Sequence, residues 1–177
     1  AIVPDRADAM FFAGDIGQRI FQQPFSWKGL GIDVRGRSFT LKVNYRTSHQ
    51  IRRMADSLLP NNVRDVDGEE DQRKGTVSVF DGVEPVVVIA PTPEEEMISA
   101  ATFLKALVDS GVAPSEIGIF CRSNDEIARA ARVAEAADVA TVSALHAASS
   151  NEAVLIGTMH LAKGLEFRAV ILIACDE

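Results

Sequence analysis

The sequence predicts an α/β fold whose sheet is mostly parallel, with helices on both faces. Three apolar runs lack the alternation of a half-exposed strand and are typical of buried strands: IGIFC (117–121), AVLIG (153–157) and AVILIA (169–174). Segments with apolar residues at helical spacing separate or precede these runs. Strands that alternate with helices favour crossover connections and therefore parallel pairing.

The composition is that of an ordinary folded domain. The chain has 177 residues, of which 47% are hydrophobic and 24% charged, so it can bury a core. No apolar run approaches the roughly 18 residues of a membrane span, and no signal peptide opens the chain, so we expect no membrane partner and a cytoplasmic location. The net charge of −7 argues against binding nucleic acid by bulk charge, but it leaves room for a local groove.

The two cysteines each lie at or beside the end of an apolar run. The spacing of Cys121 and Cys175 fits no metal or redox motif, so we expect two buried free thiols and no metal site. The chain starts at Ala1 rather than methionine and stops directly after an apolar run. We therefore expect it to be a piece of a longer protein.

The first half of the chain is predicted to contain four further strands and one helix. The predicted strands are residues 9–13, 39–43, 76–80 and 85–90. The charged segment 61–75 is predicted to be an exposed loop. Thr47 and Gln50 have the spacing of a capping box, so a helix should begin there and end at Pro60. Its apolar face would consist of Ile51, Met54, Ala55, Leu58 and Leu59.

Two helices are predicted in the second half. Pro93 and the three glutamates after it are typical of a helix start, because acidic side chains interact favourably with the helix N-terminus. This helix should end at Gly111. Its buried face would consist of Ile98, Ala101, Leu104, Leu107 and Val108. The second predicted helix spans 125–137.

Polar groups follow several of the predicted strands directly. They are Gly14–Gln18, Asn44–Arg46, Arg122–Asn124 and Thr158–His160. Ligands of open α/β sheets bind at the carboxyl ends of the strands, so these groups indicate one site along one sheet edge.

These polar and aromatic side chains have chemistry that suits nucleotides and nucleic acids. Arg46 can contact a phosphate oxygen, Gln18 can bind a phosphate or orient a water, and Glu166 can accept bonds from ribose hydroxyls. Aromatic residues can stack on bases, and a threonine, a histidine and loop backbone can hold phosphates. Taken singly, each residue also fits a surface ion pair or a structural role.

The spacing of three segments resembles that of a known family. GDIGQRIF (14–21), LKVNYRTSHQI (41–51) and VLIGTMHLAKGLEFRAVIL (154–172) resemble, in order, motifs III, IV and V of the UvrD/Rep family of superfamily I DNA helicases. The third segment contains the family's T-x-H-x-x-K-G-L-E-F pattern. IGIFCRSN (117–124) resembles the strand before the family's insertion point. The resemblance extends from about Phe11 to Ala174.

The resemblance implies a RecA-like, P-loop NTPase-type fold. These helicases have two RecA-like motor domains that bind ATP between them. Residues 1–37 would be the tail of the first motor domain and include motif III. Residues 38–177 would be the second motor domain, with motifs IV and V, and would end before motif VI.

The resemblance also implies roles for individual residues. Gln18 would sense the γ-phosphate and Arg46 would contact it, so these two would be the catalytic residues. Tyr45 would stack on adenine and Glu166 would bind the ribose. Gly164 would shape the loop that contacts the nucleotide. DNA would be bound by Phe21, Trp27, Thr158, His160 and Lys163.

The implied function is ATP-dependent movement along single-stranded DNA. The cofactors would be ATP and Mg²⁺, with Mg²⁺ bound mainly by a first motor domain of the same protein that lies outside this chain. The sequence contains no GxxxxGK[ST] loop and no motif VI, so this chain alone should not hydrolyse ATP. The family's large inserted subdomain is replaced by the short segment 138–154, and QQPFS separates Phe21 from Trp27. The alternatives are a related motor that serves RNA or a nuclease or defence complex, and a non-catalytic binding module.

Overall fold

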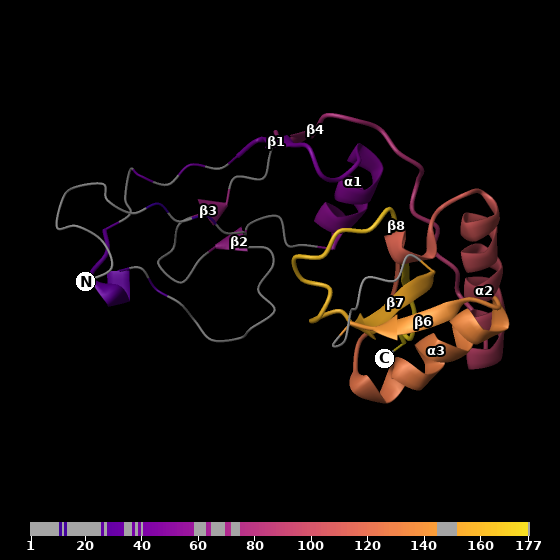
Figure 1. Cartoon of the computed structure of the whole chain (residues 1–177). Coiled ribbons are helices and arrows are strands. Elements are labelled where there is room, and N and C mark those ends of the chain that lie inside the picture. The colour runs from indigo at the N-terminus through magenta and orange to yellow at the C-terminus, as the bar shows by residue number, and fades with distance from the viewer. Residues whose placement is uncertain are drawn as a thin grey trace. The chain divides into compact units, whose positions relative to one another are not determined.

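Four parallel strands form the sheet in the C-terminal half of the computed structural model (Figure 1). They are β5 (Ile117–Cys121), β6 (Ala140–Ser143), β7 (Ala153–Thr158) and β8 (Ala169–Leu172). Their order across the sheet is β6-β7-β5-β8. The predicted α/β class and the parallel pairing are therefore confirmed. Strand β6 was not predicted, because its sequence ATVS contains no apolar run, and it lies in the segment interpreted as the remnant of an insertion.

The structure describes residues 11, 13, 26, 28–33, 37, 39, 41–58, 63–64, 70–71, 75–144 and 152–176. The chain divides into two compact units, Ala1–Val86 and Val87–Glu177, and each is described by itself. The domain boundary expected after residue 37 stays a prediction. None of the described helices is long and apolar enough to cross a membrane.

Both α-helices of the second unit cover the same face of the sheet. They are α2 (Pro93–Asp109) and α3 (Ile127–Ala136). The two helices contact each other, while α2 lies on β8 and α3 lies on β5, β6 and β7. Two short 3-10 helices, η3 (Pro114–Glu116) and η4 (Asn124–Glu126), precede β5 and α3. Among the described helices of this unit, α2 and α3 thus cover one face, whereas the sequence predicted helices on both.

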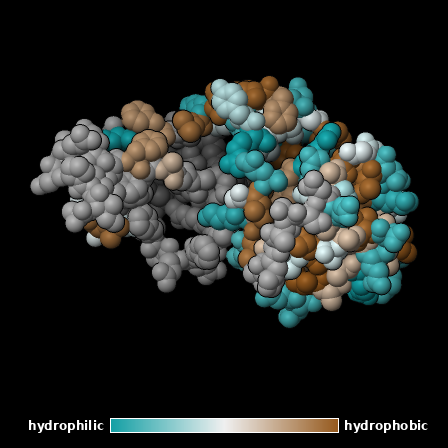
Figure 2. All heavy atoms as spheres, in the orientation of Figure 1, coloured by the Kyte–Doolittle hydropathy of each residue, from teal (hydrophilic) through white to brown (hydrophobic). Residues whose placement is uncertain are grey.

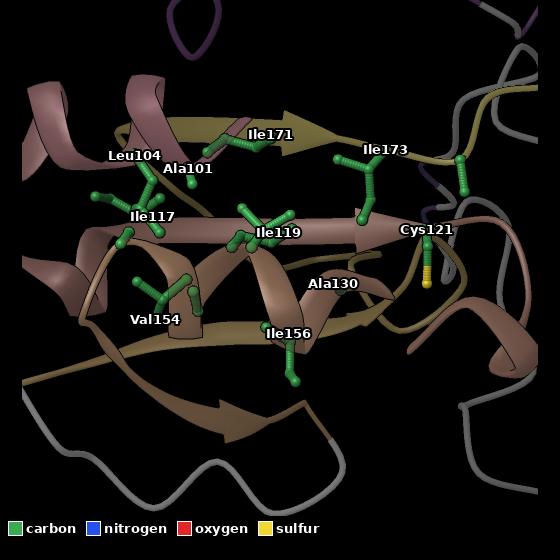
Figure 3. Close-up of a cluster of buried hydrophobic side chains, with 14 of the residues drawn as sticks. Ala101, Leu104, Ile117, Ile119, Cys121, Ala130, Val154, Ile156, Ile171 and Ile173 are labelled. Atoms are coloured by element: carbon green, nitrogen blue, oxygen red, sulfur yellow. The ribbon is translucent and has the colours of Figure 1, made fainter. Parts of the chain in front are cut away.

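The hydrophobic core lies between this face and the two helices (Figure 3). Every second residue of β5 points into it, and Leu104 and Val133 approach from the helices. The labelled core residues in Figure 3 are Ala101, Leu104, Ile117, Ile119, Cys121, Ala130, Val154, Ile156, Ile171 and Ile173. Of the predicted buried face of α2, Ala101 and Leu104 are buried and Leu107 and Val108 are partly buried, but Ile98 is 58% exposed.

The opposite face of the sheet contains Gly118 and an aromatic pair. Gly118 aligns with Leu155 of β7 and Val170 of β8. Phe120, which follows on the same face, packs edge-to-face against Phe167, with ring centroids 5.3 Å apart and planes at 65°. A side chain at Gly118 would overlap the Phe120 ring, so the absence of a Cβ makes room for this packing.

Helix α2 begins and ends as the sequence predicts. Thr92 is extended and its hydroxyl accepts a hydrogen bond from the Glu95 N–H at 3.2 Å, which satisfies one free donor of the first turn. Pro93 occupies the first turn, where no N–H is needed. Gly111 follows the helix at φ 91°, in the left-handed region that favours glycine.

The first unit contains the short helix α1 (His49–Ser57). Its N-cap is Ser48, whose hydroxyl accepts from the Ile51 N–H at 3.4 Å, so the capping box predicted at Thr47 is wrong by one residue. Gln50 does not reach back to the cap. Its amide instead donates to Asp81 at 3.2 Å and accepts from the Gly82 N–H at 2.7 Å. The helix ends before the predicted stop at Pro60, with Leu58 as its C-cap.

Strands in the first unit are shorter than predicted. Strand β1 (Val43–Asn44) pairs in parallel with β4 (Val77–Ser78). In the segment predicted to be a loop, β2 (Val63–Arg64) pairs antiparallel with β3 (Glu70–Asp71). Residues 85–90 form no strand, contrary to the prediction. Of the strand predicted at 9–13, only residues 11 and 13 are described, and neither is in a strand.

Candidate functional site

The loop between β7 and β8 leaves the sheet at its carboxyl edge. Thr158 is the last residue of β7 and is buried, aligned with Cys121 at the end of β5. The next residue, Met159, donates its N–H to the Cys121 carbonyl at 3.0 Å. The start of the loop is thereby fixed to the end of the central strand.

Tight turns shape the middle of this loop. The Leu161 N–H donates to the Thr158 carbonyl at 2.9 Å, and the Leu165 N–H donates to the Ala162 carbonyl at 3.0 Å. Gly164 lies inside the second turn at φ 84°. A side chain at this φ would be strained, which explains the glycine at this position of the motif.

The far end of the loop is fixed to the other face of the sheet. Phe167 packs against Phe120, as described above. The Arg168 N–H donates to the Glu116 carbonyl at 2.8 Å, and its guanidinium lies 3.7 Å from the Glu116 carboxylate. Between the two fixed ends, the loop exposes His160, Lys163 and Glu166. A loop of this kind can present these three side chains to a ligand from a defined backbone.

Tyr45 and Arg46 lie on a turn directly after β1. The Asn44 side-chain carbonyl accepts from the Arg46 N–H at 2.9 Å and from the Thr47 N–H at 3.1 Å. This Asx turn leads into Ser48, the cap of α1. Both predicted site residues are exposed. Tyr45 is 71% exposed, so its ring can offer a flat face to a base.

The structure thus brings five of the predicted site residues together on one loop and two on one turn. The loop holds Thr158, His160, Lys163, Gly164 and Glu166. The turn holds Tyr45 and Arg46 and belongs to the other unit. Gln18, Phe21 and Trp27 lie outside the described residues.

An ion-pair cluster beside the same sheet edge was not predicted. The Arg129 guanidinium lies 2.6 Å from Glu96, 3.3 Å from Asp176 and 3.5 Å from Glu126. Glu96 also accepts from the Ala174 N–H at 2.9 Å, just after β8. From the sequence, Glu96 was interpreted only as part of a helix start. No local pattern connects it with Arg129 or Ala174, which lie far away in the chain.

The cluster shifts the ionisation of two of its members. Burial lowers the pKa of Arg129, but the hydrogen bond to Asp176 and the attraction of Glu96 outweigh it and raise this pKa. A hydrogen bond from its own backbone N–H, followed by the bond from Arg129, lowers the pKa of Asp176. Both groups are therefore charged throughout the neutral range.

The two cysteines are free thiols, as predicted. Cys121 is buried, but Cys175 is exposed, which corrects the prediction that both are buried. Desolvation by burial is the largest cause that raises both thiol pKa values. The negative charge of Glu126 adds to it at Cys121, and the negative charge of Glu96 adds to it at Cys175. Neither thiol is therefore an activated nucleophile. The described residues contain no cluster of three or more metal-ligating side chains.

Comparison of the chain with protein-family models, with curated proteins and with solved structures gives no match.

Proposed function

We propose that this chain contains the tail of the first motor domain and the second motor domain, up to motif VI, of an ATP-dependent translocase that moves along single-stranded DNA, of the UvrD/Rep helicase type. One observation carries the proposal: the T-x-H-x-x-K-G-L-E-F pattern of residues 158–167 lies on the loop at the carboxyl end of a parallel strand. That edge is where α/β sheets bind their ligands. The pattern is long and specific, which sets it apart from a chance cluster of polar residues.

The residues present fit only part of an ATP site. Arg46 would contact the γ-phosphate, Tyr45 would stack on adenine, and Glu166 would accept bonds from the ribose. A phosphate-cradling glycine-rich loop is absent from the sequence, and the described residues contain no group of three or more side chains that could hold Mg²⁺. The triphosphate and its metal ion are therefore assigned to a first motor domain, with Gln18 of its tail sensing the γ-phosphate. Bound ATP would supply the free energy that draws two motor domains together and releases them on hydrolysis.

The DNA contacts would come from the other side of the same loop and from the tail of the first motor domain. Thr158 and His160 would bind the phosphates of one strand, with Lys163 adding charge. Phe21 and Trp27 would stack on bases, which is independent of sequence because every base has a flat face. Binding of this kind needs only a local groove and is compatible with a net charge of −7.

The proposal is tested by measuring ATP turnover of the full-length protein that contains this chain. We expect turnover to rise on addition of single-stranded DNA and to rise less with RNA of the same length. Stronger stimulation by RNA would favour a motor that serves RNA. If no nucleic acid binds or stimulates turnover, the motor assignment is wrong and a non-catalytic module takes its place.

A further inference from the structure

The dipeptide formed by Asp81 and Gly82 follows strand β4 and belongs to no helix or strand. Hydrophilic side chains cover much of the described surface in Figure 2, and both residues of the dipeptide are exposed, so water reaches them. An aspartate followed by glycine is prone to react with its own backbone. The reason is that glycine has no Cβ to shield its peptide nitrogen or to restrict the chain around it.

The reaction to which this dipeptide is prone is the closure of a cyclic imide. The Gly82 nitrogen attacks the side-chain carboxyl carbon of Asp81 and a C–N bond forms, while the nitrogen proton and the carboxyl OH leave as water. Water then opens the ring at either carbonyl. Opening at the side-chain carbonyl restores aspartate, and opening at the main-chain carbonyl gives isoaspartate, whose main chain runs through the side-chain carbons. Water is the only other reactant.

The side chain of Gln50 holds both reacting groups. The Gly82 N–H donates to Gln50 Oε1 at 2.7 Å, and Gln50 Nε2 donates to Asp81 Oδ1 at 3.2 Å. The hydrogen donated to Gln50 is the one that ring closure removes. The Asp81 carboxyl group must also turn from Gln50 onto the Gly82 nitrogen. In the folded chain, ring closure therefore requires these two hydrogen bonds, which we call the Gln50 bridge, to open first.

The helix that carries Gln50 is docked on the same segment of the chain. Gln50 lies in the first turn of α1. The N–H of His49, the first residue of the helix, donates to the Phe80 carbonyl at 3.1 Å. One turn further on, Arg53 forms an ion pair with Glu84. The Gln50 bridge is thus flanked by a contact on either side, which keeps the amide in place.

A close contact with the cap of α1 explains why residue 82 is glycine. A Cβ added to Gly82 would lie 2.8 Å from the Ser48 Cβ and 2.9 Å from its hydroxyl oxygen. Ser48 is buried and caps the helix, so it cannot move away without loss of the cap. The fold therefore requires a glycine after Asp81, and the reactive dipeptide comes with this requirement.

We propose that Asp81 is a latent site of isoaspartate formation, which the Gln50 bridge suppresses as long as α1 is docked. Isoaspartate adds a main-chain carbon between Asp81 and Gly82, and the added length would displace Gly82 from Ser48 and from Gln50. Isomerisation would therefore make the undocking of α1 permanent. The proposal is independent of the motor function, because it rests only on contacts within the first unit.

Ageing of the full chain at neutral pH tests the proposal. Isoaspartate is counted by enzymatic methylation of its free carboxyl group and is assigned to residue 81 by peptide mapping. We expect the chain to form it at least ~10-fold more slowly than a peptide of residues 77–86, in which nothing holds the dipeptide. Equal rates in the chain and the peptide overturn the proposal.

Two alanine substitutions in α1 give a matched pair. Gln50→Ala removes both hydrogen bonds of the bridge and should form isoaspartate at least ~5-fold faster than the unsubstituted chain. Arg53→Ala removes the contact of the same helix with Glu84 but leaves the bridge, so it should age like the unsubstituted chain. Equal acceleration in both variants, or none in Gln50→Ala, contradicts the role of Gln50.

Hydrogen exchange of the unsubstituted chain adds a measurement that does not depend on the folding of a variant. The Gly82 amide, which donates to Gln50, should exchange at least ~10-fold more slowly than the same amide in the peptide of residues 77–86. Exchange as fast as in the peptide would show that the bridge does not persist in solution, and it would overturn the proposal.

Discussion

Arg129 of α3 holds Glu96 of α2, with Nη2 and Oε2 2.6 Å apart. The same glutamate accepts the Ala174 N–H through its second oxygen, so one carboxylate connects both helices to the end of β8. Ala174 lies at φ 53°, a region that favours glycine, and this hydrogen bond helps to hold it there. The contact therefore stabilises the packing of α2 and α3 against the carboxyl end of the sheet, which is the edge where the 158–167 loop begins.

Arg129→Leu should therefore destabilise the second unit. The substitution leaves Glu96 poorly paired in a mostly buried place. Removing one partner of a fully buried pair costs about 3–5 kcal/mol, and partial exposure reduces this to about 1–3 kcal/mol. Chemical denaturation measures the loss. Arg132→Leu, an exposed arginine on the same helix, is the control and should change the free energy of unfolding little. Equal effects of both variants would show that the cluster adds nothing.

The cluster also predicts a pH dependence of stability. The pKa of Asp176 is lowered in the folded protein, so its contribution is present above the pKa of the unfolded state and is lost as the pH falls through the folded value. Asp176→Asn should thus be less stable than the unsubstituted chain at neutral pH, and the difference should vanish in acid below the ordinary range of aspartate. Thermal melts of both proteins, from neutral pH down to well below the ordinary pKa of aspartate, measure it. A difference that does not depend on pH would contradict the ionic role.

Gly118→Ala should disturb the face of the sheet opposite the helices. Its Cβ would overlap the Phe120 ring and approach Phe167 to 3.3 Å. Overpacking of this kind costs about 1–3 kcal/mol, which denaturation can measure. Phe120→Leu replaces the ring with a smaller side chain and should relieve part of the clash. The double variant should therefore lose less free energy of unfolding than the two single variants lose together. Additive losses would mean that the glycine serves another purpose.

The sequence predicted the sheet better than its surroundings. Strands β5, β7 and β8 and helix α2 carry apolar runs or end signals that depend only on neighbouring residues. Strand β6 has one large apolar residue, Val142, and its place in the sheet is set by pairing with β7. The predicted strand at 85–90 has strand-like composition, yet the structure leaves it unpaired, because composition does not supply a partner.

In the candidate site, too, local sequence features were predicted, while a contact between distant residues was not. Its residues were predicted from motif spacing, and the anchoring of the 158–167 loop explains why the spacing matters. Gly164 makes a turn, and Phe167 packs on Phe120. The contact of Glu96 with Arg129 was not predictable, because it joins side chains that only the packing of two helices brings together.

Arg46→Ala should reduce ATP turnover of the full-length protein while sparing DNA binding. Loss of one charged contact to the developing phosphate charge is expected to lower turnover on the order of 10²–10³-fold. Steady-state ATPase assays and fluorescence anisotropy with labelled single-stranded DNA measure the two properties. Arg53→Ala is the control, because this exposed arginine of α1 pairs with Glu84 at the surface, where ion pairs contribute little. Unchanged turnover in Arg46→Ala would refute the phosphate role.

Glu166→Ala should weaken nucleotide binding by on the order of 1–3 kcal/mol, the scale of lost hydrogen bonds to a charged group. The residue is exposed near the end of a loop that is fixed at both ends, so its removal should not unfold the unit. Titration with a fluorescent ATP analogue gives the affinity. A 2′,3′-dideoxy analogue separates a ribose contact from a general charge effect: it should bind the variant and the unsubstituted protein equally well. Glu135→Ala, on the exposed side of α3, removes the same charge elsewhere and serves as control. Equal affinity of Glu166→Ala and the unsubstituted protein for the ribose form would show that the nucleotide is held without this carboxylate.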